Sequence, residues 1–303
     1  MRFDFIKNRK IYFIISVSII VVSLICAVAF GVNLDIEFKG GTMITYSYEG
    51  TIDTKAFESA IEDVVGNVSI RESNSIATGA TNLVVTLASN EGITPETMEK
   101  INTTVEEPFS VKYVESSTVD PTIGGEMLLK SLVAVAIASA LMIVFIGFRF
   151  RKIGGWSAGV CAVIALLNDI FVVFATFVIF GISIDTNFMA VVLTILGYSV
   201  NDTIVIYDRI RENKTTLGAG VPVAELVNTS LNECFRRTVL TTLTTVSALV
   251  VVCVVAIVFN VTSILSFAFP MMIGMIHGVY SSIGVAPQLW VLWQQRKEAK
   301  KVA

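Results

Sequence analysis

One stretch decides the fold: Thr194-Ile195-Leu196-Gly197-Tyr198-Ser199-Val200-Asn201-Asp202-Thr203-Ile204-Val205-Ile206-Tyr207-Asp208-Arg209. It is an apolar run of the kind that spans a membrane, yet it carries a carboxylate near its middle. An ionised Asp at the centre of a bilayer helix costs about 2.5 to 3.5 kcal/mol on insertion scales. Such residues usually face a bundle interior, a partner or a water path, so the sequence predicts a polar site at Asp202.

Helical geometry arranges this stretch into faces. At about 100° per residue, six side chains fall on one third of the helix circumference. They are Thr194, Tyr198, Asn201, Asp202, Val205 and Asp208, and we expect this stripe to be an internal face. Asn201 and Asp202 could simply join helices through hydrogen bonds worth about 1 kcal/mol each. We favour a proton relay, because Asn alone would join helices, whereas the neighbouring titratable group adds a proton-binding site.

Composition places the chain in a membrane. Of its 303 residues, 54% are hydrophobic and 16% charged, and the mean hydropathy is +0.74, which is too apolar for an ordinary soluble domain. A spanning helix needs roughly 20 mostly apolar residues. Six segments qualify, at about 11–31, 127–148, 156–180, 187–207, 238–259 and 264–291.

The basic residues give an orientation. If the N-terminus is cytoplasmic, 16 of the 22 Lys and Arg residues lie in cytoplasmic pieces, as the positive-inside rule requires. The expected organisation is a cytoplasmic N-terminus and first helix at 1–31, an extracytoplasmic domain at 32–126, five further helices at 127–291 with a cytoplasmic loop at 208–237, and a cytoplasmic tail at 292–303. The first helix is interpreted as retained rather than as a signal peptide, because it lacks a convincing small-residue cleavage site.

Several classes of function find no support in the sequence. The segment 32–126 has no Cys, which excludes a disulfide framework there, and His277 is the single histidine, which excludes a His-rich metal site. There is no G-x-x-x-x-G-K-[ST] phosphate loop, so no ATP or other cofactor is expected. The Arg clusters sit at helix ends, where membrane topology accounts for them, and nucleic acid is not an expected partner.

The segment 32–126 alternates strand and helix patterns. Strands are expected at 42–48, 68–71, 82–88 and 110–114, with helices at 53–65 and from 94 to just before Pro108. The order βαββαβ is that of a ferredoxin-like domain. Its acids are scattered and have no His or Cys beside them, so a binding or mechanical role is favoured over an enzymatic one. The glycine-containing stretches at 31–42 and 119–126 are interpreted as turns, the second of them as a hinge or a passive linker.

Further polar residues lie within the predicted helices. Asn168 and Asp169 fall in the middle of the third, and Asp169 is either a second titrating group or a hydrogen-bond acceptor between helices. Arg237 opens the fifth; it could pair with Asp202 or extend to the lipid headgroups, and its position alone favours the headgroups. The sixth carries Gly274 and Gly278, whose spacing allows close packing. Prolines at 270 and 287 are expected to kink or end this helix.

Together these motifs resemble the SecF family of protein-export membrane proteins, which is related to the resistance-nodulation-division (RND) transporters. The matching segments are Gly197-Tyr198-Ser199-Val200-Asn201-Asp202, Asp208-Arg209-Ile210-Arg211-Glu212-Asn213, the turn Asp35-Ile36-Glu37-Phe38-Lys39-Gly40-Gly41-Thr42, Asn168-Asp169, Arg237-Thr238 and Gly278-Val279-Tyr280-Ser281-Ser282. The resemblance implies an RND-like half bundle of six helices with one ferredoxin-like domain. It also implies that Asp202 is the proton-linked aspartate, that Arg237 is its arginine on the next helix, and that Asp169 is a further family position.

For function, the resemblance implies a non-enzymatic subunit of the bacterial cell membrane. It would act with SecD beside the SecYEG channel, with YajC as a further candidate partner and with membrane lipid and the translocating polypeptide as contacts. Proton or sodium entry would drive the outer domain to assist export, since one charge crossing 100 mV releases about 2.3 kcal/mol. Two alternatives were weighed, namely an RND-type exporter of small molecules or lipids and a non-transporting scaffold.

Overall fold

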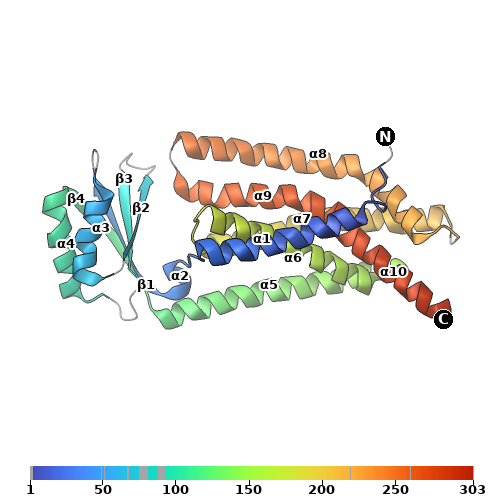
Figure 1. Ribbon diagram of the computed structural model, residues 1–303, viewed down its shortest axis with the longest axis horizontal. Coiled ribbons are helices and arrows are strands. Elements are labelled where there is room, and N and C mark those ends of the chain that lie inside the picture. Colours follow the sequence, from blue (N-terminus) through green and yellow to red (C-terminus); the bar gives the residue numbers. More distant parts are fainter. Residues whose placement is uncertain are drawn as a thin grey trace.

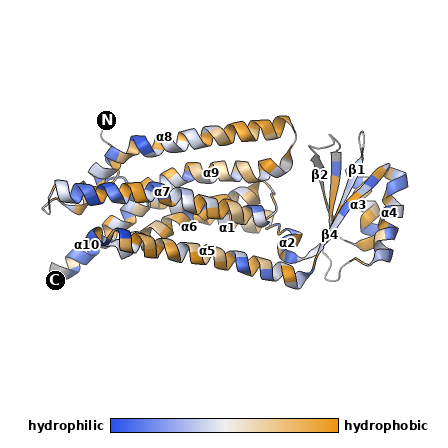
Figure 2. Cartoon of the chain, turned by 180° about the vertical axis from the view of Figure 1, so that it is seen from behind, coloured by the Kyte–Doolittle hydropathy of each residue, from blue (hydrophilic) through white to orange (hydrophobic). Residues whose placement is uncertain are grey.

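The computed structural model describes residues 3–48, 50, 52–66, 68–74, 81–87, 93–218, 220–259 and 261–302. A helical bundle forms one end of the molecule and a small mixed domain the other, and both termini lie at the bundle end remote from that domain (Figure 1). By length and composition, six helices in the described part of the chain could cross a membrane. Apolar residues dominate the central stretches of the bundle, with hydrophilic ones near the termini (Figure 2). The predicted polytopic architecture is therefore confirmed.

The bundle is built around α7. Its helices are α1 (Arg9–Phe30), α5 (Pro121–Arg149), α6 (Gly155–Ile179), α7 (Thr186–Thr216), α8 (Val223–Val258), α9 (Thr262–Gly284) and α10 (Ala286–Val302), with a 3-10 turn, η1 (Arg151–Ile153), between α5 and α6. α7 packs against α6, α8 and α9. In the most apolar 18-residue stretch of each helix, half or more of the residues of α6 and α7 are buried within the chain. The corresponding share is 11% for α1 and for α5. The outer helices thus leave most of their surface uncovered by the chain itself.

The mixed domain has the predicted ferredoxin-like topology. In chain order it comprises β1 (Gly41–Tyr48), α3 (Thr54–Val65), β2 (Val68–Asn74), β3 (Thr81–Leu87), α4 (Pro95–Phe109) and β4 (Val111–Val119). The strands run in the order β2-β3-β1-β4, with every neighbouring pair antiparallel. Alternating residues of β1 and β3 pack against the two helices, and the pair Ile44 and Phe57 is fully buried. This core is separate from that of the bundle.

Two boundaries of this domain differ from the sequence prediction. α4 continues through Pro108 and ends at Phe109, because Ser110 takes a left-handed conformation (φ 51°) that ends the helix one residue later. β4 is longer than expected, and α5 follows it directly, so the segment 119–126 is not a loop. Asp120 accepts a hydrogen bond from the backbone N–H of Thr122 (2.8 Å) and caps α5, with Pro121 at the first helical position.

The bundle also differs at its two polar ends. The segment expected as the loop 208–237 is mostly helix, because α7 runs on to Thr216 and α8 begins at Val223. Charged residues end a membrane span but do not end a helix, and here they make ion pairs on its surface. The sixth predicted span is interrupted near Pro287, as the sequence predicted. α9 ends at Gly284 and α10 begins at Ala286, with Pro287 in the first turn of α10, where its missing N–H costs little. Pro270 lies within α9.

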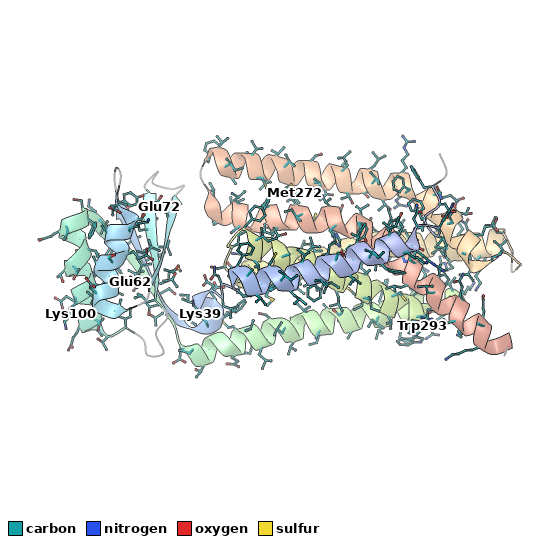
Figure 3. All side chains as sticks on the ribbon, viewed as in Figure 1. Lys39, Glu62, Glu72, Lys100, Met272 and Trp293 are labelled. Carbon is teal, nitrogen blue, oxygen red and sulfur yellow. The ribbon has the colours of Figure 1, made fainter. Side chains whose placement is uncertain are left out.

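A short helix, α2 (Ile36–Lys39), connects the bundle to the sheet, where the sequence predicted a plain turn. Its Lys39 lies between the two parts of the molecule (Figure 3). Asp35 caps α2 by accepting from Glu37 N (3.3 Å). On the bundle side, Asp35 N donates to Ile184 O (3.0 Å), and Glu37 Oε2 accepts from Thr186 N (3.0 Å) at the start of α7. The element that enters β1 is thus hydrogen-bonded to the helix that carries Asp202.

Candidate ion-coupling site

The polar stripe of α7 is not the internal face that periodicity predicted. Thr194 and Asn201 are exposed in this chain, whereas Ile195, Val200 and Ile206 are buried. The stripe exists, but α6 and α9 cover the neighbouring side of the helix. Periodicity identifies a polar face without identifying which neighbour covers it. Asp202, at one edge of the stripe, is the member that the chain encloses.

Asp202 is enclosed between α7 and α8. Its exposed fraction is 5%, and its Oδ2 atom has no hydrogen-bond partner among the described residues. The hydroxyl of Thr242 on α8 interacts with the carboxylate. Tyr198, one turn earlier on α7, donates to Thr242 (3.3 Å) and Thr245 (3.2 Å). Asp202 therefore belongs to a polar seam between α7 and α8, with acceptor capacity left open.

Arg237 on α8 is the basic residue whose charge acts on the Asp202 carboxylate. It acts on Asp202 through its charge, while no direct ion pair joins the two in the described part of the chain. Of the two alternatives that the sequence left open for Arg237, a direct pair with Asp202 is not formed, and the two side chains interact only through their charges. Thr238, next in sequence, is buried, and its hydroxyl has no partner among the described residues. Both side chains lie one to two turns from Thr242 along α8.

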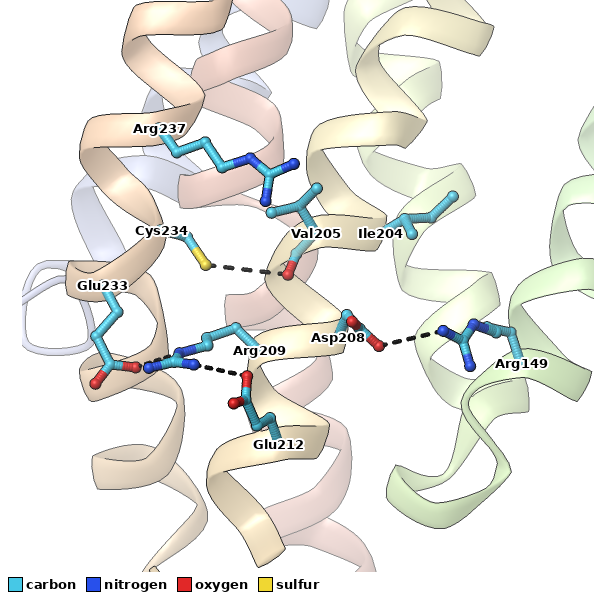
Figure 4. Close-up of a pocket in the computed structure, with 9 residues that line it drawn as sticks. All are labelled: Arg149, Ile204, Val205, Asp208, Arg209, Glu212, Glu233, Cys234 and Arg237. Carbon is cyan, nitrogen blue, oxygen red and sulfur yellow. Dashed lines mark hydrogen bonds and ion pairs between the residues drawn. The ribbon is translucent and has the colours of Figure 1, made fainter. Parts of the chain in front are cut away.

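A cavity opens beside this seam at the bundle end that carries the termini. It has a volume of about 420 Å³. Its lining comes from α5, α7 and α8 and consists of Arg149, Ile204, Val205, Asp208, Arg209, Glu212, Glu233, Cys234 and Arg237 (Figure 4). We call this cavity the vestibule. Arg237 lines the vestibule and also acts on Asp202 through its charge, whereas Asp202 itself is not a lining residue.

Ion pairs cross the vestibule between helices. Arg209 on α7 pairs with Glu233 on α8 (2.7 Å) and with Glu212 (2.6 Å). Asp208 lies 3.6 Å from Arg149 on α5 and 2.5 Å from Arg211. The Asp208-Arg209 motif therefore links α7 to α5 through Arg149 and to α8 through Glu233. These contacts are partly exposed, so each contributes little to stability.

Asp169 occupies a different environment, sealed between α6, α7 and α9. It is fully buried, and its Oδ2 accepts hydrogen bonds from Ser199 (2.7 Å) and Ser281 (2.9 Å). Its Oδ1 lies 3.6 Å from Nε2 of His277 and has no hydrogen-bond partner among the described residues. The structure thus separates the two Asn-Asp pairs of the sequence. Asp202 sits beside a cavity, and Asp169 sits in a closed core.

The glycines of α9 hold this core together. A Cβ on Gly274 would collide with the Ile195 side chain, and one on Gly278 would lie 3.2 Å from Ser199. Gly197 differs, since nothing lies within 4 Å of the position its Cβ would take. Gly274 and Gly278 therefore bring α9 close enough for Ser281 and Ser282 to reach α6 and α7. Gly197 faces the open side of α7.

The glycine-containing turn that enters β1 has a packing role. Gly40 (φ +77°) and Gly41 (φ +131°) have backbone conformations that favour glycine. A Cβ on Gly40 would meet the backbone of Pro121, and one on Gly41 would meet the carbonyl of Leu87. Thr42, which follows, is buried, and its hydroxyl lies 3.0 Å from that of Thr118. The turn clamps α2 against α5 and β3.

Sequence reasoning missed several members of the site. Tyr198 was placed on the stripe, but its bonds to Thr242 and Thr245 depend on how α7 and α8 pack. His277 was considered only as a metal ligand, and its contact with Asp169 joins residues 108 positions apart, which no periodicity reveals. The run of threonines Thr238, Thr241, Thr242 and Thr245 on α8 is a usable signal in the sequence. Thr242 and Thr245 accept from Tyr198 of α7, whereas Thr241 is exposed and donates to its own helix.

Comparison with known proteins gives the family. The family model described as protein export membrane protein SecD/SecF, C-terminal, matches residues 97–296. This chain belongs to the SecD/SecF family. A SecF protein translocase subunit from Sebaldella termitidis is 32% identical over 99% of this chain and 95% of its own length. Within the family, the chain therefore resembles SecF over nearly its whole length.

Longer SecDF proteins of the family match as well. SecDF of Bacillus subtilis is 32% identical over 100% of this chain, which spans 40% of that protein. The crystal structure of SecDF from Thermus thermophilus, described as a translocon-associated membrane protein, superposes with a TM-score of 0.81 at 28% identity, covering 97% of this chain and 39% of that one. A crystal structure of SecDF in a super-membrane-facing form gives a TM-score of 0.70. The SecF-like chain thus corresponds to less than half of a SecDF protein.

Proposed function

We propose that this protein is a subunit of the bacterial Sec protein-translocation machinery, in which Asp202 binds and releases a proton or sodium ion to assist late export of polypeptides. The observation that carries the proposal is the placement of Asp202. It is a buried carboxylate with an open acceptor atom and a Thr242 hydroxyl beside it, and the charge of Arg237, which lines the vestibule, acts on it. Family membership supplies the process, because the relatives are named protein translocase subunits.

The partner proposed from these features is a SecD-like half bundle. The relatives that fuse SecD and SecF in one chain are more than twice as long as this one. The exposed stripe of α7, including Thr194 and Asn201, is polar and would be unfavourable against acyl chains. A second half bundle would cover this stripe and enclose Asn201 next to Asp202. The SecYEG channel, YajC and the translocating polypeptide are proposed contacts of the assembled complex.

The proposed orientation follows the charges. The termini and the vestibule, with its several Arg residues, share one end of the bundle, which we assign to the cytoplasm of a bacterial cell membrane. Residues 32–126 are then extracytoplasmic. In the proposed mechanism, an ion that reaches Asp202 from outside leaves past Arg237 through the vestibule, which Arg237 lines. Asp169 remains a candidate for a second ion-binding group.

Motion would pass from α7 to the outer domain through α2. Glu37 accepts from the first turn of α7, and the backbone of residues 33–35 pairs with Ile184 just before it. Gly40 and Gly41 then connect α2 tightly to α5 and β3. A shift of α7 on ion binding would therefore move the sheet domain as a unit. In the proposed mechanism, that movement assists the outward passage of polypeptide.

The test is an export assay with Asp202→Asn, Asp202→Glu and the stripe control Asn201→Ala. Asp202→Asn keeps the size of the side chain but removes the ion-binding charge. If one charge per step is lost at 100 mV, about 2.3 kcal/mol is missing, which corresponds to a slowing of up to about 50-fold. Asp202→Glu should retain part of the activity, and Asn201→Ala most of it. Normal release of a secreted protein by a membrane-inserted Asp202→Asn variant, under an energised membrane, would refute the proposal.

A further inference from the structure

The single histidine of the chain contacts the sealed carboxylate. Nε2 of His277 lies 2.9 Å from Asn168 Oδ1 and 3.6 Å from Asp169 Oδ1. The His277 side chain is 11% exposed, and that of Asp169 is 0% exposed. Asp169 Oδ1 is also a buried atom without a hydrogen-bond partner among the described residues. An unpartnered carboxylate oxygen therefore faces an imidazole from the neighbouring helix.

The hydrogen on this imidazole can be assigned from its neighbour. Asn168 Nδ2 donates to Ser16 O (3.2 Å), so the amide turns its oxygen toward His277. An amide oxygen only accepts, and Nε2 therefore carries a hydrogen. At 3.6 Å the same N–H does not yet bond Asp169, but a small rotation of the ring would exchange Asn168 for Asp169. Asp169 Oδ2 is already occupied by Ser199 and Ser281, which leaves Oδ1 to receive it.

The surroundings provide no other charge for this pair. The groups that face it are neutral hydroxyls and amides: Asn168 from α6, Tyr12 and Ser16 from α1, Ser199 from α7, and Tyr280 and Ser281 from α9. α8 contributes the thiol of Cys253 to its contact with α9. In the described part of the chain, His277 is the one basic side chain placed beside Asp169. An isolated ionised carboxylate in such a closed site is strongly unfavourable.

We propose that Asp169 and His277 form a proton-sharing pair, which makes a second proton-binding site in the bundle. The pair holds one proton in addition to that of the neutral imidazole. In the ion-paired form both ring nitrogens carry a hydrogen, and Nε2–H faces the ionised Oδ1. When that hydrogen passes to Oδ1, both groups are neutral, the ring keeps its one hydrogen on Nδ1, and Nε2 becomes the acceptor of Oδ1–H. Transfer of the proton between the two groups leaves the net charge of the site unchanged, so no uncompensated charge forms in the closed core. Release of the proton leaves one uncompensated negative charge, so the pair holds it strongly.

This inference rests on the proposed function in one respect, namely that Asp169 was named there as a candidate second ion-binding group. The pair would form whether or not Asp202 couples ions to export, because it depends on α6 and α9 alone. Ser199 connects the two sites, since it donates to Asp169 from α7, one turn before Asp202. A change of protonation at the pair would therefore alter a contact of the helix that carries Asp202. Failure of the export test and failure of the pair remain separate outcomes.

The chain has one histidine, so imidazole ¹⁵N spectra of the full chain, labelled at His and reconstituted in lipid bilayers, report this site directly. We expect the wild-type signals to change with pH in one step. Asp169→Asn should abolish that step or move its midpoint down by at least about one pH unit, a tenfold loss of proton affinity. Asp202→Asn, the matched control, should leave it in place. An imidazole that does not respond to pH, or whose response Asp169→Asn leaves unchanged or moves up, would overturn the proposal.

A second variant covers the case in which Asp169→Asn does not fold. His277→Gln keeps a donor toward Asn168 but cannot take the shared proton. The infrared band of the protonated Asp169 carboxyl should then differ in its midpoint between wild type and His277→Gln by at least about one pH unit, because in the variant the carboxyl no longer shares its proton with a ring. No carboxyl band that depends on residue 277 would mean that the pair does not share a proton.

Discussion

The sealed core around Asp169 and the seam around Asp202 use the same side chain for different ends. Asp169 is surrounded by α6, α7 and α9, with two serine hydroxyls on one oxygen and an imidazole near the other. Asp202 lies on α7 with the Thr242 hydroxyl nearby, and Arg237, whose charge acts on it, lines a cavity of about 420 Å³. Both carboxylates are buried and both keep one oxygen without a hydrogen-bond partner among the described residues. What distinguishes them is their surroundings, a closed core for Asp169 and a seam close to a cavity for Asp202.

The two sides of α7 should respond most differently to added bulk. Gly274→Leu would drive a side chain into Ile195 and Val173, and overpacking of this kind costs about 3 kcal/mol. Gly197→Leu, on the open side, has space and should change stability by less than about 0.5 kcal/mol. Unfolding of the purified chain in detergent measures both. Equal losses would show that the two sides of α7 are not sealed and open as described.

Removal of each carboxylate gives the next largest contrast. Asp169→Ala deletes the acceptor of two buried hydroxyls and should cost about 2 kcal/mol. Asp202→Ala removes a group with an open acceptor atom and should cost about 0.5 kcal/mol. The same unfolding assay decides the order. If Asp202→Ala destabilises the chain as much as Asp169→Ala, the seam is a structural element and the contrast fails.

The α2 connection can be tested with a smaller change. Glu37→Ala removes the acceptor of the Thr186 N–H at the start of α7 and should cost about 1 kcal/mol. It should also weaken export more than it weakens folding, because α2 is the proposed link between α7 and the sheet. Glu62→Ala, an exposed position on α3, is the matched control. Equal export by the two variants would remove α2 from the mechanism.

The smallest expected effect is a pH dependence at Asp185, which caps α7 outside the membrane. Burial raises the pKa of the Asp185 carboxyl, and the charges of Glu37 and Asp35 raise it further, while hydrogen bonds from Phe188 N–H and the Asn187 side chain oppose the rise. Because the folded state binds this proton more readily than the unfolded state, its contribution to stability is full below the unfolded pKa, near 4, and is lost as pH rises through the folded pKa.

Asp185→Asn keeps a capping side chain without the charge. Its unfolding midpoint should therefore fall less than that of the wild type between about pH 4 and pH 7. Thermal unfolding across this range, with both proteins in the same detergent, gives the comparison. Parallel curves would mean that Asp185 does not contribute in this way.

Much of the architecture could be predicted from local patterns. Runs of apolar residues gave the six membrane helices, and alternation with turn residues gave the βαββαβ domain. The ends of α7 and α8 were misjudged because charge marks the membrane boundary, whereas a helix can continue into water. The internal side of α7 was misjudged because periodicity defines faces but not their neighbours. The contact between His277 and Asp169 depends on tertiary packing alone.

The central claim is that Asp202, rather than Asp169, exchanges an ion with the cytoplasmic vestibule. The direct measurement is the flux of protons or sodium ions, driven by their own gradient, into vesicles that contain the chain together with a SecD-like partner. Wild type, Asp202→Asn and Asn201→Ala are compared. The account predicts flux in the wild type and in Asn201→Ala and little or none in Asp202→Asn, with all three proteins equally well folded. Undiminished flux through Asp202→Asn would contradict it.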